Sequence, residues 1–140
     1  MALIDLDTLG PMALSCELGD AWRSWCNPAG EDDPAACRFS VELFAASLEG
    51  WWHTGPRPEG IERDSLLDGP ERICLELAAR FCADAVANSY FREDREEHPQ
   101  PGAHNLLRAR CQHALARSAH EARPACAEVL AACAAEARTH

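Results

Sequence analysis

The sequence predicts a mainly helical fold with one short β-strand or hairpin at its N-terminus. Apolar residues recur at helical spacing along most of the chain, and Pro- and Gly-containing segments separate these periodic stretches. Only the beginning differs, because the apolar run of residues 2–4 opens directly into carboxylates, as a short buried strand ending in a turn does. The 140 residues are enough for a single domain, residues 1–140, with one modest core.

The N-terminal half is predicted to contain the strand and two helices. The strand ends at a Gly-Pro turn at residues 10–11, and apolar residues at helical spacing predict a first helix over residues 14–25. An Asp-Pro pair at 33–34 begins a second helix, with the Asp as N-cap and the Pro at the first helical position, and this helix reaches about residue 51. The segment that follows, 53–60, is predicted to be a loop.

The C-terminal half is predicted to contain three helices, of which the longest spans residues 70–91. Its buried face is expected to contain four apolar residues: Ile73, Leu77, Phe81 and Ala85. Four charged residues are spaced four apart and are expected to form an alternating ion ladder: Arg72, Glu76, Arg80 and Asp84. Two prolines then interrupt the chain before a helix over residues 102–121, and Pro124 is expected to begin a last helix that reaches about residue 137.

The composition argues against several functional classes. The formal net charge is −10, whereas nucleic-acid binding requires a basic surface, so no nucleic-acid partner is expected. No apolar run approaches the roughly 20 residues that span a bilayer, and the N-terminus lacks the basic segment of a signal peptide. We therefore expect a cytoplasmic protein without membrane contact. The eight cysteines lack the C-x-x-C and C-x-x-H spacings of zinc sites and are expected to pack as small apolar residues.

Two carboxylates near the N-terminus are the first candidates for a functional site. Asp5 and Asp7 follow the apolar run at the point where the predicted strand ends. Phosphoryl-transfer enzymes hold magnesium with carboxylates placed in this way, since the ion must reach the nucleotide phosphates. The alternative is an ordinary turn in which both residues only end the strand.

Three blocks of sequence occur in a recognisable order. They are Ile4-Asp5-Leu6-Asp7-Thr8 with Glu17-Leu18-Gly19-Asp20-Ala21-Trp22-Arg23, then Leu75-Glu76-Leu77-Ala78-Ala79-Arg80-Phe81 with Asp84 and Tyr90-Phe91, and finally His104-Asn105-Leu106-Leu107-Arg108-Ala109-Arg110-Cys111-Gln112. Together they resemble the C-terminal lobe of the aminoglycoside-phosphotransferase and choline-kinase-like superfamily, in particular its N-acetylhexosamine 1-kinase-like sugar kinases. The resemblance covers residues 2–120 and implies the helical C-lobe of a protein-kinase-like fold, with residues 121–140 as a C-terminal helix.

The resemblance implies a role for each matching residue. Asp5 would bind the Mg²⁺ that accompanies ATP, with Asp7 as a further ligand or support. Five residues would brace the active-site loops or the start of a helix: Glu17, Asp20, His104, Asn105 and Arg108. Glu17 stands where the family usually has Asp, so its longer side chain puts that contact in question. Arg80 and Asp84 would face the acceptor substrate, although they also have the spacing of a surface ion pair.

Several parts of a phosphotransferase have no counterpart in these residues. The chain contains no lysine, no Gly-rich phosphate loop and no H-x-D…N segment with a catalytic base. We therefore expect a C-terminal fragment of an ATP-dependent, sugar-directed phosphotransferase that is inactive alone. Its N-lobe would come from a longer product or from a partner. ATP and Mg²⁺ are the cofactors that the resemblance implies, and a small molecule is the implied acceptor.

Two other functions remain open. A helical binding or adaptor module would keep the kinase scaffold without its chemistry and would associate with itself or with another partner through the lobe face left exposed. Arg108 and His113 also match the loose R-x4-H pattern of small helical ribonucleases. That spacing is frequent by chance in helices that contain Arg and His, and an acidic chain is a poor RNA binder.

Overall fold

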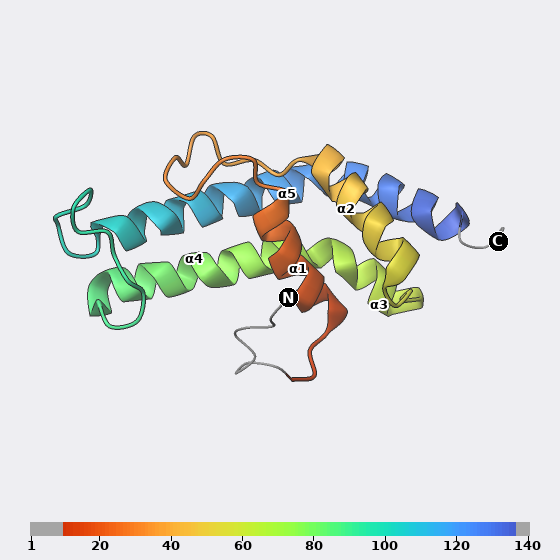
Figure 1. Ribbon diagram of the computed structural model, residues 1–140, viewed down its shortest axis with the longest axis horizontal. Helices are drawn as coiled ribbons and strands as arrows, with labels where there is room; N and C mark the ends of the chain where they lie inside the picture. The colour runs from red at the N-terminus through yellow and green to blue at the C-terminus, as the bar shows by residue number, and fades with distance from the viewer. Residues whose placement is uncertain (1–9, 137–140) are drawn as a thin grey trace, which may run out of the picture.

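Two long antiparallel helices form the framework of the protein (Figure 1). The structure is a computed structural model that describes residues 10–136. Helix α4 spans Gly69–Ala87, and α5 spans Ala103–Glu136 beside it. The shorter elements are α1 (Leu14–Trp25), α2 (Val41–Thr54), α3 (Gly60–Ser65) and the 3₁₀ helix η1 (Leu66–Asp68). No strand occurs within residues 10–136, so the predicted helical class is confirmed, whereas the predicted N-terminal strand lies outside the described residues together with Asp5 and Asp7.

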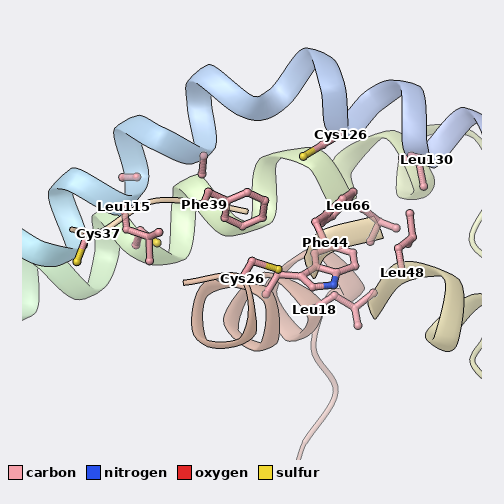
Figure 2. Packing of buried hydrophobic residues seen from close by; sticks show 14 of the residues in the cluster. Leu18, Cys26, Cys37, Phe39, Phe44, Leu48, Leu66, Leu115, Cys126 and Leu130 are labelled. Atoms are coloured by element: carbon pink, nitrogen blue, oxygen red, sulfur yellow. The ribbon is translucent and has the colours of Figure 1, made fainter. Parts of the chain in front are cut away.

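The core lies where α1 and α2 pack against the α4–α5 pair (Figure 2). Trp22 of α1 is completely buried, and its ring meets that of Phe44 edge-on with 4.8 Å between the ring centroids. Other fully buried side chains of this cluster come from the residue after α1 and from α2, η1, α4 and α5: Cys26, Leu48, Leu66, Cys74, Cys111 and Leu115. The cysteines fill apolar space here, which agrees with the packing role predicted for them.

Helices α1 and α4 approach each other most closely at two glycines. A Cβ built on Gly19 would lie 2.6 Å from the carbonyl carbon of Gly69, and one built on Gly69 would lie 2.1 Å from the carbonyl oxygen of Ser15. Both glycines are buried. No side chain fits between the two backbones, so glycine at these positions lets the helices cross in direct contact.

The N-terminal helices agree with the prediction at one end and differ at the other. Helix α1 has the predicted bounds, but α2 begins at Val41 rather than at residue 34. Asp33 accepts the N–H of Ala35 at 2.9 Å and so forms a local turn, while Ser40 caps α2 by accepting the N–H of Leu43 at 3.2 Å. The segment predicted as a loop contains the end of α2 and the start of α3.

Helix α4 is buried on a face shifted by about one residue from the predicted one. Of the four expected residues only Phe81 is fully buried, and the observed buried face contains Cys74, Ala78, Phe81 and Asp84. The shift arises because α1 and α5 both pack on α4. It also overturns the predicted ion ladder, since Asp84 points into the protein and none of the ladder's pairs forms among the described residues.

Helix α5 is continuous where two helices were predicted. It passes through Pro124, which is exposed, although proline lacks the N–H that a helix interior requires. Buried residues continue on one face across the proline: Leu115, Ala119, Cys126, Leu130 and Ala134. Their burial offsets the single lost hydrogen bond, so the prediction of a break was wrong. Among the described residues, no helix is both long and apolar enough to cross a membrane.

Candidate functional site

The second sequence block folds around a buried carboxylate at the end of α4. Asp84 is only 4% exposed, and one of its oxygens accepts the backbone N–H groups of Ser89 and Tyr90, each at 2.9 Å. The other oxygen accepts the N–H of Phe91 at 2.8 Å. These bonds, that of Ser89 first among them, hold the pKa of Asp84 below its ordinary value. The charged carboxylate thus orders the turn after α4, where Asn88 adopts a left-handed conformation with φ of 50°.

Asp84 also joins the second block to the third. Asn105, which is completely buried in the first turn of α5, donates from Nδ2 to Asp84 at 3.1 Å. The same junction brings Gly102 against the backbone of α4, since a Cβ at Gly102 would lie 2.1 Å from the carbonyl oxygen of Ala85. Its φ of 77° also favours glycine. The end of α4 and the start of α5 are therefore held together by a buried polar bond and a close backbone contact.

Two arginines and three aromatic rings form a stack beside this junction. The guanidinium carbon of Arg108 lies 4.0 Å from the centroid of the Phe81 ring and 5.7 Å from that of Phe91. That of Arg80 lies 5.4 Å from the centroids of both Tyr90 and Phe91. Each distance is within the range of cation–π attraction. Tyr90 is 73% exposed, so the outer end of this stack is open to solvent.

A carboxylate that the sequence interpretation did not single out connects this stack to α1. Glu31 accepts hydrogen bonds from Arg23 at 3.3 Å, from Arg108 at 3.2 Å and from Gln112 at 2.9 Å. Gln112 is almost completely buried. Glu31 stands in an acidic loop, where nothing in the local sequence distinguishes it from the neighbouring acids, and only the fold reveals its partners.

Of the remaining predicted site residues, Glu17 and Asp20 lie apart from the buried junction. Glu17 is exposed on α1, and Asp20 bonds to Arg23 of the same helix at 2.9 Å. Arg80 reaches outward to Tyr90, whereas Asp84 is directed inward, so the two form no common surface. Their assignment to an acceptor site stays a prediction. So does magnesium binding by the N-terminal carboxylates, which lie outside the described residues.

The residues of the ribonuclease pattern do not converge on one site. Arg108 is occupied by Glu31 and the Phe81 ring. His113 is exposed five positions further along the same helix, which places it about 140° around the axis. In a ribonuclease, the general acid and the phosphate-binding cation must lie on the same face of the helix, which Arg108 and His113 do not.

The described residues offer limited further chemistry. No group of three or more His, Cys, Asp or Glu side chains within residues 10–136 is arranged to hold a metal ion. A pocket of about 420 Å³ lies between the loop after α2 and α5, and it is lined by Trp52, Arg57, Glu59 and Arg63 rather than by residues of the three blocks. These observations define a domain whose regular elements within residues 10–136 are all helices, with a buried polar junction. Comparison of the chain with models of protein families finds no match.

Proposed function

We propose that the chain is the helical C-terminal lobe of an ATP-dependent small-molecule phosphotransferase with a sugar as acceptor. The observation that supports this best is the bond between Asp84 and Asn105, which joins two of the three sequence blocks across 21 positions. The first block is linked to the third through Arg23, Glu31 and Arg108. The three sequence blocks that resemble a kinase lobe are thus linked to one another by side-chain contacts. Such links are expected if the blocks belong to one lobe.

Magnesium and ATP enter this proposal only through Asp5 and Asp7. The described part of the chain provides no cluster of ligands that fits a metal ion, and we therefore derive no catalytic step through one. The chain also contains no lysine to pair with nucleotide phosphates. We propose that the nucleotide-covering lobe and the catalytic base come from a further segment or a partner.

The proposal is tested on the protein purified from its own source, at whatever length it has there. Its intact mass is measured first, and transfer of the γ-phosphate of ATP to N-acetylhexosamines is then assayed. We expect Asp5→Asn to abolish transfer, and we expect the control Asp64→Asn, an exposed carboxylate in α3, to leave it unchanged. Transfer at the unmodified rate by Asp5→Asn, or no binding of Mg-ATP by the native protein together with any partner that copurifies with it, would refute the proposal.

A second candidate, a helical binding module, is favoured by the exposed side of α4. Leu75 and Val86 are 45% and 90% exposed, and Ala79 and Cys82 lie between them at the spacing of one helix face. Light scattering over a range of protein concentrations tests this function. Association that Val86→Glu removes would support it, whereas a monomer at all concentrations without binding partners would count against it.

A further inference from the structure

The start of α5 is anchored to the preceding loop by a nitrogen that can be protonated. The backbone N–H of Asp94 donates to Nδ1 of His104 at 2.9 Å. Because Nδ1 accepts this bond, it carries no proton, and His104 is the neutral tautomer with its proton on Nε2. Nε2 faces the carboxylate of Asp32 at 3.8 Å.

A second imidazole lies directly against this one. The rings of His98 and His104 are stacked, with 4.7 Å between their centroids and 23° between their planes. Both residues are half-buried. Two stacked neutral imidazoles attract each other, whereas two imidazolium ions at this distance repel each other strongly.

We propose that His104 is a pH-sensitive latch that fastens the turn of residues 94–98 to α5 and releases it when the ring is protonated. Protonation places an N–H on Nδ1, directly opposite the N–H of Asp94. The acceptor is lost, and two donors then face each other. The ring must turn away, and the amide of Asp94 becomes free to exchange with solvent.

The charged and titratable groups around His104 have opposite effects on the protonation of its ring. They come from the loop after α4, from the loop after α1 and from α5: Glu93, Asp94, Arg95, His98, Glu31, Asp32 and Arg108. The carboxylates of Asp94 and Asp32 attract an imidazolium, whereas His98 and the N-terminal end of α5 repel it. Neither effect restores the bond from the Asp94 amide, because that bond requires the unprotonated nitrogen.

The release is local and not a general unfolding. Glu93 accepts the N–H of Gly102 at 3.2 Å and pairs with Arg95 at 2.8 Å, which keeps the rest of the junction in place. Tyr90 and Phe91, on which the arginine stack rests, keep their backbone hydrogen bonds to Asp84, so the stack retains its support. This inference does not depend on the proposed phosphotransferase function.

Nuclear magnetic resonance of the whole chain tests the latch. The protonation of His104 is followed by its ring Cε1 proton, and the exchange protection of the Asp94 amide, corrected for the intrinsic pH dependence of exchange, is measured in the same samples. We expect protection to fall by about tenfold as the ring becomes charged, with the same midpoint, since one hydrogen bond is lost. Unchanged protection of the Asp94 amide while the ring titrates would overturn the proposal.

Variants separate the latch from other effects of pH. In His104→Asn the side-chain Oδ1 stands near the position of Nδ1 and accepts at all pH values, so protection of the Asp94 amide should persist to pH about 5. In His98→Phe a stacked ring remains without a second charge, and the Asp94 amide should still lose protection when the ring of His104 is protonated. His120→Gln is the control, because His120 lies further along α5 and pairs with Glu71 at 3.0 Å. The same loss of protection in His104→Asn as in the unmodified protein would refute the latch.

Discussion

Replacing Gly19 with alanine is the sharpest test of the packing described above. The new Cβ would lie 2.6 Å from the carbonyl carbon of Gly69 and 2.8 Å from its oxygen, whereas ordinary contacts are 3.4–4 Å. Both helices present backbone at this point, so no flexible side chain can move aside. We therefore expect α1 and α4 to separate by about 1 Å, which disturbs the packing of the adjacent Trp22.

The magnitude follows from two opposing effects. Overpacking of a buried contact costs about 1–3 kcal/mol. Alanine in place of glycine within a helix contributes about 1 kcal/mol of stability in the opposite direction. Gly50 in α2 isolates the second effect, because it is exposed and nothing lies within 4 Å of a Cβ built on it. The difference in unfolding free energy between Gly19→Ala and Gly50→Ala should thus be about 1–3 kcal/mol.

Urea denaturation followed by circular dichroism at about 222 nm measures this difference. Gly50→Ala should be more stable than the unmodified protein, and Gly19→Ala should be less stable than Gly50→Ala. In thermal unfolding, the same difference would appear as roughly 3 °C in melting temperature for each kcal/mol. Gly69→Ala should destabilise further, since its Cβ would lie 2.1 Å from the Ser15 oxygen. If Gly19→Ala is as stable as Gly50→Ala, the direct crossing of α1 and α4 is wrong.

Three further predictions concern single side chains. The hydrogen bonds to Asp84, that of Ser89 first, lower its pKa in the folded protein. The charged carboxylate therefore stabilises the fold fully above about pH 3.9, the pKa of Asp in the unfolded chain, and this stabilisation is lost as the pH falls through the lower pKa of the folded protein. Asp84→Asn should have a lower free energy of unfolding at pH 7, and its free energy of unfolding should fall less steeply as the pH is lowered. The same fall in acid as in the unmodified protein would contradict this role of Asp84. Burial raises the pKa of the Cys74 thiol to about 12, so Ellman's reagent at about pH 8 should label the exposed Cys82 first and Cys74 only after unfolding; early labelling of Cys74 would show that this part of the core is open. Pro124→Ala should raise the unfolding free energy by about 1–3 kcal/mol, because it restores a helical N–H at an exposed position, and a loss of stability in the same urea titration would contradict the continuous α5.

The parts of the fold that were predictable are those fixed by local periodicity. The bounds of α1 and the start of α4 follow from the spacing of apolar residues, because each helix buries one continuous stripe. Helix α4 ends at Ala87 rather than at the predicted residue 91, because Asn88 adopts a left-handed conformation. The start of α2 was misplaced because Asp33 and Ser40 are both good N-caps, and only the path of the chain decides between a turn and a helix.

The candidate site was predictable in its residues but not in its bonds. The sequence blocks identified Asp84 and Asn105 separately, yet their contact depends on how α4 and α5 align. The i,i+4 rule assigned Asp84 to a surface ion pair, and burial of that face of α4 overrode it. Glu31 was missed because two of its three partners, Arg108 and Gln112, lie in α5, far from it in the sequence. No local pattern in the sequence predicts that α5 and Arg23 of α1 meet at Glu31.

The position of Arg108 has a consequence for how substitutions in this chain should be judged. Its guanidinium lies over the Phe81 ring while its Nε donates to Glu31, so it meets an aromatic face and a carboxylate at once. An ammonium group carries the same charge but has neither a planar face nor a donor along its edge. Arginine-to-lysine exchange, which is usually tolerated on protein surfaces, would therefore be a change of shape at this position. In a chain without a single lysine, arginine at residue 108 is required for its flatness as much as for its charge.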